Sequence, residues 1–214
     1  MKFQAVIFDC DGVLVDSELL AAQVFVECVA DLGLDMALEE AIGAYKGKKL
    51  AVCVADVERR LGRSVPNSFI TDFRTRSAEV FQARLQPIPG VEGVIETVRS
   101  LSIPFCVASS GPREKIEANL TITGLRSYFQ GNIVSAYEVG SWKPDPSLFL
   151  HAAQTLGAAP RTCAVIEDSL PGVQAGVAAG MTVYGYAADS DAGTLAAAGA
   201  QIFQEMNELI ALLR

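Results

Sequence analysis

Two aspartates separated by one residue, Asp9 and Asp11, follow directly on a short apolar run near the start of the chain. Alternate side chains of a strand share a face, so both carboxylates can serve one reaction centre. Gly12 comes next, and a glycine there lets the backbone turn sharply and approach a small anion closely. An acidic turn that only closes a strand has the same sequence, so this motif is weak by itself.

Three further polar stretches give the aspartate pair its significance. They are Ser109-Ser110-Gly111, Lys143-Pro144 and Glu167-Asp168-Ser169. Each has a structural alternative: a strand-to-helix turn, a solvated loop lysine, and a helix N-cap at Ser169 before Leu170-Pro171. The occurrence of all four stretches in one chain strengthens the prediction of a site for a small anion.

Short, β-prone apolar runs place these stretches in a fold. The runs lie at 3–8, 104–108, 162–166 and 182–186. Each is followed by small or acidic residues and then by a helical pattern, which predicts an α/β protein with a doubly wound parallel sheet. Ligands of such sheets bind beyond the carboxyl ends of the strands, where Asp9, Ser109 and Asp168 are expected to lie.

A helical insertion interrupts the alternation of strands and helices. Helix-like patterns without a convincing strand occur at 17–32, 37–44, 48–62 and 68–85. The Pro-rich turn at 86–90 has the composition of a domain boundary. We therefore expect a small helical cap over residues 17–86, inserted after the first strand of a catalytic core that comprises residues 1–16 and 87–214. The stretch 187–200 has the pattern of a short helix with loops.

Composition excludes several classes of protein. The formal charge of −8 disfavours nucleic acid and anionic membranes as partners, and no apolar run approaches the roughly 20 residues of a membrane span. The apolar stretch before Asp9 is too short for a signal peptide, so a cytoplasmic location is expected, with a monomer favoured. Five widely spaced cysteines without a Cys-x-x-Cys pair suggest neither a disulfide framework nor a zinc site.

The four polar stretches, in this order and at this spacing, resemble the motif set of the haloacid dehalogenase-like (HAD) phosphatases. The resemblance spans the whole chain: the segment 8–17 is similar to the first motif, and the helical insertion lies where one type of cap of that family belongs. Within the family the chain is most similar to β-phosphoglucomutase-like sugar-phosphate phosphatases. The stretches 8–18 and 142–146, with His151-Ala152-Ala153, most resemble the bacterial 6-phosphogluconate phosphatases.

This resemblance implies a two-step reaction on a phosphate ester. Asp9 attacks phosphorus and becomes an aspartyl-phosphate, while Asp11 protonates the leaving oxygen and then activates water. Two carboxylates would repel a phosphate, so a cation is required, and an oxygen-only site suits Mg²⁺. The implied ligands are Asp9, Asp168 and the main-chain carbonyl of Asp11, with Glu167 nearby or bound through water.

The resemblance also assigns the groups that bind the phosphoryl oxygens. Ser109 would donate its hydroxyl together with the neighbouring N–H groups, including that of Ser110, and Lys143 would balance the charge of the transition state. The implied substrate is a small phosphorylated sugar or sugar acid, such as 6-phosphogluconate.

A cluster of lysines in the cap is unusual for so acidic a chain. Lys46, Lys48 and Lys49 surround Gly47. A solvated face explains them equally well, but one or two could reach a carboxylate or second phosphate of the substrate. Arg74 and Arg76 compete for that role.

Two other functions stay open. A phosphosugar mutase of the same family carries a cap histidine where this chain has Ala21, which opposes that function, whereas Val13 is shared with β-phosphoglucomutase. A non-catalytic sugar-phosphate-binding regulator is the second alternative, although every group that the reaction needs is present. His151 is the only histidine and is expected to pack in the middle of a helix, which argues against a Ser-His-Asp triad.

Overall fold

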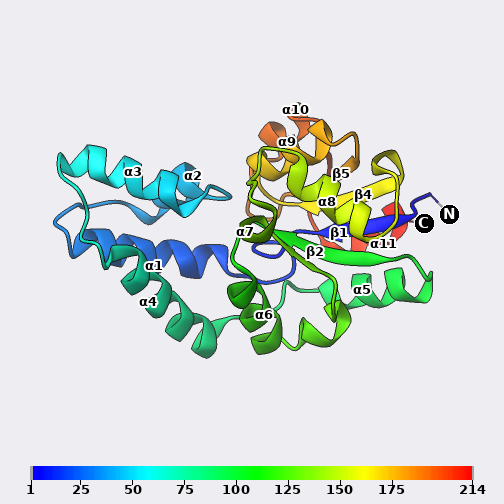
Figure 1. Cartoon of the computed structure of the whole chain (residues 1–214), viewed down its shortest axis with the longest axis horizontal. Coiled ribbons are helices and arrows are strands. Elements are labelled where there is room, and N and C mark those ends of the chain that lie inside the picture. Colours follow the sequence, from blue (N-terminus) through cyan, green and yellow to red (C-terminus); the bar gives the residue numbers. More distant parts are fainter. Residues whose placement is uncertain (1, 214) are drawn as a thin grey trace.

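A six-stranded parallel sheet forms the centre of the larger lobe in the computed structural model, which describes residues 2–213 (Figure 1). In spatial order the strands are β3 (Ile133–Ser135), β2 (Phe105–Ser109), β1 (Ala5–Phe8), β4 (Cys163–Glu167), β5 (Thr182–Tyr186) and β6 (Gln201–Phe203). The strand order reverses direction beside β1, as in doubly wound folds. The predicted α/β class and parallel sheet are thus confirmed.

The register of the central strands brings the polar stretches together. Phe8 of β1 pairs with Val107 of β2 on one side and with Ile166 of β4 on the other. Since all three strands run parallel, their carboxyl ends meet at one edge of the sheet. Asp9 and Asp168 follow β1 and β4 directly at this edge.

Two strands were not predicted, because each is only three residues long. Neither β3 nor β6 offers enough residues for an apolar run or an alternating pattern to be recognised, and Gln201 of β6 is exposed. Between β5 and β6 the short helix expected within 187–200 is present as α10 (Ala192–Ala197).

Helices cover both faces of the sheet, and the alternation of side chains along β1 decides which residues face which layer. Val6 and Phe8 pack under α5 (Val91–Ser100), α6 (Arg113–Ile122), the 3₁₀ helix η1 (Leu125–Phe129) and α11 (Met206–Leu213). Ala5 and Ile7 pack on the opposite layer of α8 (Ser147–Thr155), α9 (Leu170–Ala178) and α10. A short helix α7 (Ala136–Val139) and a 3₁₀ turn η2 (Pro160–Thr162) complete the core. Every residue of β1 is therefore buried.

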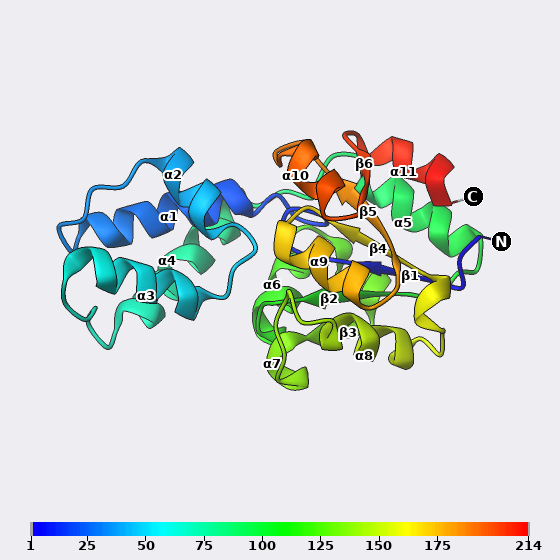
Figure 2. The same cartoon turned by 90° about the horizontal axis from the view of Figure 1, so that it is seen from above.

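The second lobe consists of the four helices between β1 and α5 (Figure 2). They are α1 (Glu18–Ala30), α2 (Leu38–Tyr45), α3 (Leu50–Leu61) and α4 (Phe69–Arg84). Three of them fall within a range predicted to be helical, and α2 extends one residue beyond the predicted 37–44. Phe25 is the centre of a separate hydrophobic cluster and makes edge-to-face contacts with Tyr45, Phe69 and Phe73. This lobe, hereafter the cap, therefore packs around apolar residues of its own.

Two chain segments that lie side by side join the cap to the core. The backbone N–H of Asp16 donates to Gln86 O at 2.9 Å, and that of Ile88 donates to Leu14 O at 3.0 Å. These contacts lie at the predicted cap boundaries. The assignment of 17–86 as a separate domain stays a prediction, with this paired connection in its support.

Single residues complete the comparison with the sequence. All five cysteines are buried and free. His151 lies in the middle of α8 as expected, but the expectation that it packs is wrong, because its position on the helix faces solvent. Within residues 2–213, the helices are all too short or too polar to cross a membrane.

The packing around η1 generates a test of the core. Phe129 is fully buried and makes edge-to-face contacts with Phe8 and Phe105. Phe129→Ala should lower the free energy of unfolding by about 3 to 5 kcal/mol, since it removes apolar contacts and leaves a cavity. Chemical denaturation followed by circular dichroism measures the change. Leu150→Ala on the solvent side of α8 is the control, and an equal loss in both variants would contradict this account of the core.

Candidate active site

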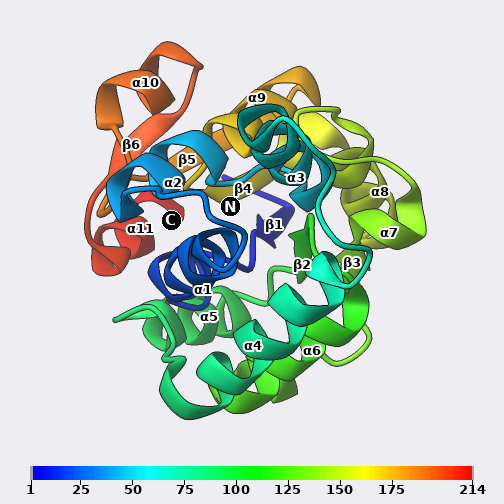
Figure 3. The same ribbon diagram turned by 90° about the vertical axis from the view of Figure 1, so that its left-hand side faces the viewer.

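The carboxyl edge of the sheet faces the cap across a cavity of about 640 Å³. Figure 3 looks at the molecule from the cap side, with α1 to α4 in front of the sheet. Asp9, Asp11 and Lys143 line the cavity from the core, and Lys46 to Lys49 line it from the cap. Residues far apart in the sequence are thus brought to one site.

Lys143 is the cation at the bottom of this site. Its buried ammonium lies 2.8 Å from Asp9 Oδ1 and 2.7 Å from Glu167 Oε1. Burial raises the pKa of Asp9 well above its usual value, although the charge of Lys143 acts against this increase. Burial also acts to raise the pKa of Glu167, but the Lys143 ammonium outweighs it and holds that pKa below its usual value. Lys143 therefore keeps two buried carboxylates in one place.

Glu167 is enclosed on all sides and has no access to solvent. Besides Lys143, it accepts hydrogen bonds from the backbone N–H and the hydroxyl of Ser169 at 2.7 and 2.9 Å. A Cβ atom at Gly172 would lie 1.7 Å from the Oε1 atom of Glu167, so only glycine fits at this position of the helix. Ser169 also accepts from the Gly172 N–H, which confirms the predicted helix N-cap.

Three carboxylates meet closely enough to hold one metal ion. Asp9, Glu167 and Asp168 each offer an oxygen within 4.8 Å of the others. Asp9 Oδ1 and Asp168 Oδ2 are buried and accept no well-aligned hydrogen bond from the described residues, although ammonium groups lie within ion-pair distance. Buried acceptors without such partners, all of them oxygens, fit a hard cation such as Mg²⁺.

Gly12 makes room for this cluster. It adopts a φ of 76°, which favours glycine, and a Cβ atom there would lie 2.2 Å from Asp168 Oδ2. The glycine predicted to allow a sharp turn beside Asp11 therefore also leaves space for the Asp168 carboxylate.

Lys46 reaches the acidic cluster from the cap. Its ammonium lies 2.7 Å from Asp168 Oδ2 and donates a hydrogen bond to Ser190 Oγ at 2.7 Å. Burial raises the pKa of Asp168 to about 7, because the neighbouring ammonium only partly offsets the loss of water. Of the three cap lysines, Lys46 is thus placed at the carboxylates themselves.

Asp11 is held by three side chains, none of which was predicted to contact it from the sequence; Ser17 was named only as the end of the first motif. Its Oδ1 accepts from the Ser17 hydroxyl at 2.7 Å and from the Asn119 amide at 3.5 Å. Its Oδ2 accepts from the Lys115 ammonium at 2.7 Å. Burial acts to raise the pKa of Asp11, but Lys115 and Ser17 lower it below its usual value. Lys115 and Asn119 are spaced i, i+4 on the helix after Ser-Ser-Gly, which is the signal that could have identified them.

The predicted phosphate-binding serines lie at the end of β2. Ser109 is buried, and its Oγ accepts from the Gly111 N–H at 3.1 Å, so the turn is closed by its own hydroxyl. Ser110 is half-buried and lines the cavity together with Gly111. Their position beside Asp9 is compatible with the expected role, which stays a prediction.

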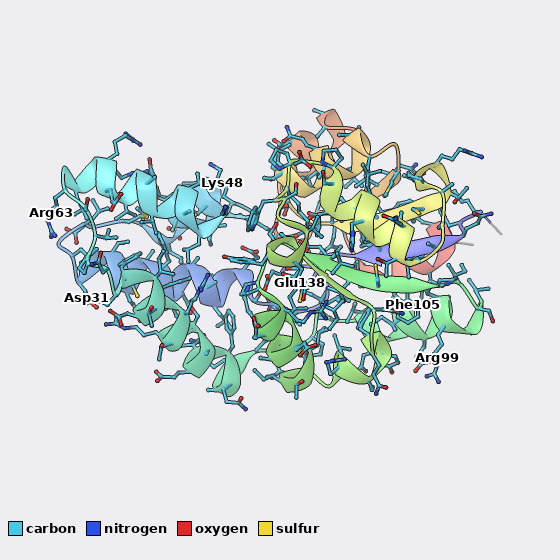
Figure 4. The ribbon with its side chains drawn as sticks, in the orientation of Figure 1. Asp31, Lys48, Arg63, Arg99, Phe105 and Glu138 are labelled. Carbon is cyan, nitrogen blue, oxygen red and sulfur yellow. The ribbon has the colours of Figure 1, made fainter. Side chains whose placement is uncertain are left out.

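The other two cap lysines face the same cavity. Figure 4 shows Lys48 at the end of the cap nearest the core. Lys49 extends from the cap to the core, where its ammonium lies 3.5 Å from the centre of the Trp142 ring. Among the described contacts, Lys49 has an aromatic partner and Lys48 has none.

The two candidate arginines of the cap have different surroundings. Arg74 lines the cavity and donates a hydrogen bond to the Tyr137 hydroxyl of the core at 3.0 Å. Arg76 instead forms an ion pair with Asp31 at 2.7 Å, at the end of the cap distant from the core (Figure 4). The expectation that Arg76 competes for the substrate is wrong, because its partner holds it away from the cavity.

Comparison with known proteins agrees with this arrangement. Residues 3–180 match the family model described as haloacid dehalogenase-like hydrolase. The chain is 32% identical over 189 residues to a 6-phosphogluconate phosphatase of Escherichia coli, with 88% of this chain and 84% of that protein covered. It is 29% identical over 216 residues to a phosphorylated carbohydrates phosphatase of Thermotoga maritima, with 99% and 98% covered.

Solved structures give the same result. A HAD family hydrolase from Deinococcus radiodurans, with bound phosphate and sodium, superposes with a TM-score of 0.82 at 32% identity and covers 99% of this chain and 95% of its own. A putative β-phosphoglucomutase from Thermotoga maritima gives 0.79 at 29% identity, with 98% of each chain covered. The predicted resemblance and the predicted enzyme class, a phosphoric monoester hydrolase, are confirmed. The chain belongs to the haloacid dehalogenase-like hydrolase family.

Proposed function

We propose that this hydrolase is a Mg²⁺-dependent phosphatase that acts on a small phosphorylated sugar or sugar acid through an aspartyl-phosphate intermediate. The observation that carries the proposal is the position of Asp9 in the cavity, between the Lys143 ammonium and the carboxylates of Glu167 and Asp168. The names of relatives, among them a 6-phosphogluconate phosphatase and a phosphorylated carbohydrates phosphatase, support the substrate class.

Asp9 is the proposed nucleophile. Lys143 fixes its carboxylate through Oδ1 and offsets negative charge where the phosphoryl group must approach. The backbone N–H groups around Ser109 and Ser110 would bind the phosphoryl oxygens and hold phosphorus in line with Asp9. Transfer to Asp9 divides one difficult displacement into two easier ones.

Asp11 is the proposed general acid and base. Ser17, Lys115 and Asn119 fix its carboxyl group on the cavity wall. In the first step the protonated form of this carboxyl group would give its proton to the leaving oxygen and become the carboxylate. The same carboxylate then takes a proton from the water that hydrolyses the intermediate.

When bound, a metal ion would supply positive charge that offsets the negative charge of the carboxylates and of the phosphate ester. Asp9, Asp168 and the main-chain carbonyl of Asp11 would hold it, with Glu167 beside them. Lys46 contacts Asp168 from the cap, so the cap lysine and the metal ion would share this carboxylate.

A phosphosugar mutase is the second candidate, because two matched structures are described as putative β-phosphoglucomutases. Ala21 opposes this function. It lines the cavity with a methyl group at the position where the mutase carries a histidine that engages the general acid. Water is therefore the proposed acceptor. A binding protein without turnover is disfavoured, since Asp9 and Asp11 are both retained in the cavity.

The decisive experiment is phosphate release across a panel of phosphate esters with Mg²⁺, including 6-phosphogluconate, glucose 6-phosphate and β-glucose 1-phosphate. Free phosphate supports the proposal. An isomerised sugar phosphate without free phosphate would establish the mutase, and binding without either product would establish the regulator.

Asp9→Asn should abolish phosphate release, because the amide cannot attack phosphorus and does not balance Lys143. A chelator should have the same effect on the unmodified enzyme, and added Mg²⁺ should restore activity. Phosphate release by a malachite green assay measures both. Full activity in either sample would refute the mechanism.

Asp11→Asn should form the aspartyl-phosphate from p-nitrophenyl phosphate, whose leaving group needs no proton, but hydrolyse it about 10²- to 10⁴-fold more slowly. Intact-mass spectrometry detects the accumulated phosphoenzyme, and Asp9→Asn is the control that cannot form it. Turnover at the normal rate would exclude the role assigned to Asp11.

Lys48→Ala should raise the KM for 6-phosphogluconate about tenfold and change that for glucose 6-phosphate much less, since a charged hydrogen bond to the carboxylate is lost. Lys49→Ala tests the neighbouring lysine in the same way. Arg63→Ala is the matched control, because it removes a cap cation at the end distant from the core (Figure 4). Unchanged selectivity in both lysine variants would show that Lys48 and Lys49 are solvated side chains that do not contact the substrate.

A further inference from the structure

Lys115 is a cavity cation that the proposed reaction leaves partly unused. It lies in the first turn of α6, and its side chain is 37% exposed and lines the cavity. An ammonium group has three donors, and among residues 2–213 the only hydrogen bond recorded for this one goes to Asp11 Oδ2. Two N–H groups therefore remain available to a ligand.

The other cavity cations are engaged differently. Lys143 is buried between Asp9 and Glu167, and Lys46 contacts Asp168 and Ser190. Both belong to the carboxylate cluster, below the position of a phosphoryl group. Lys115 instead contacts the carboxyl group that meets the leaving oxygen, so it lies on the side of the cavity where the rest of the substrate must be.

Asp11 does not depend on Lys115 alone for its position. Its other oxygen already accepts from Ser17 and from the buried Asn119. Lys115 can therefore turn a donor towards a ligand while the carboxyl group stays anchored.

Lys115 brings a positive charge to a part of the wall that also has apolar side chains. Ala118 and Ile122 of α6 line the cavity beside it together with Glu114 and Asn119, and the ring centre of Phe81 from the cap lies 5.9 Å from its ammonium. A charged donor in such a wall fixes orientation and gives selectivity, because a ligand without an acceptor there leaves the donor unpaired.

Resting on the proposed function, we infer that Lys115 determines specificity by binding an oxygen on the carbon next to the phosphoester carbon. Lys115 and the leaving oxygen of the substrate both contact the carboxyl group of Asp11, so they lie close to each other. A hydroxyl or carboxylate on the carbon next to the phosphoester carbon is only a few bonds from that leaving oxygen. The selected class is therefore phosphate esters of polyols, sugars and sugar acids, as opposed to esters of simple alcohols.

Two primary alkyl esters test this inference. Glycerol 3-phosphate has a hydroxyl on the adjacent carbon, and propyl phosphate has none. The unmodified enzyme with Mg²⁺ should show a higher kcat/KM for glycerol 3-phosphate. Lys115→Met should lower kcat/KM for glycerol 3-phosphate about 10- to 100-fold more than that for propyl phosphate, since a charged hydrogen bond to the substrate is lost for one ester only, whereas any change at Asp11 affects both esters alike. The ratio between enzymes cancels the intrinsic reactivities of the esters.

Lys115→Arg should restore most of the preference, and Lys115→Gln provides a second variant if methionine prevents folding, which circular dichroism reports. An equal loss for both esters would overturn the inference, because Lys115 would then act only through Asp11. The inference is also overturned if the unmodified enzyme cleaves p-nitrophenyl phosphate but shows no preference for glycerol 3-phosphate over propyl phosphate. If the unmodified enzyme cleaves none of the three esters, the proposed function itself fails.

Discussion

The concentration of buried negative charge at one edge of the sheet is the constraint on which the site depends. Asp9, Glu167 and Asp168 lie within metal-binding distance of one another, and carboxylates so close and so dry repel each other strongly. Lys143 offsets part of this charge from the core and Lys46 another part from the cap. The glycines at 12 and 172 and the N-cap at Ser169 accommodate this cluster. The divalent cation proposed above would offset the negative charge that the two lysines leave.

Much of this site could be predicted from the sequence, because a parallel sheet brings the carboxyl ends of its strands together. Asp9 and Asp168 follow strands that are long and apolar enough to be recognised. Ser109 ends a third such strand. Lys143 follows no predicted strand and was predicted from the Lys143-Pro144 motif. The four cap helices were likewise recognisable, since a two-lobed chain shows a change of period where one lobe interrupts the other.

The remainder depends on contacts that no local pattern records. Lys115 and Asn119 contact Asp11 across more than one hundred residues of sequence. The sequence alone does not reveal that Arg76 pairs with Asp31 and is therefore held away from the substrate. The exposure of His151 depends on which face of α8 packs on the sheet. The three-residue strands β3 and β6 exist because a neighbouring strand pairs with them, not because of their composition.

The paired connection between the lobes has a consequence for how such proteins diversify. Because the chain leaves and re-enters the core at adjacent points, residues 17–86 are equivalent to a long surface loop as far as the sheet is concerned. The entropy of closing a loop grows slowly with its length, so the insertion can be lengthened, shortened or replaced at little cost to the sheet. The core, which breaks the bond, can therefore stay under strict steric constraint while the cap, and whatever part of substrate recognition it supplies, varies more freely.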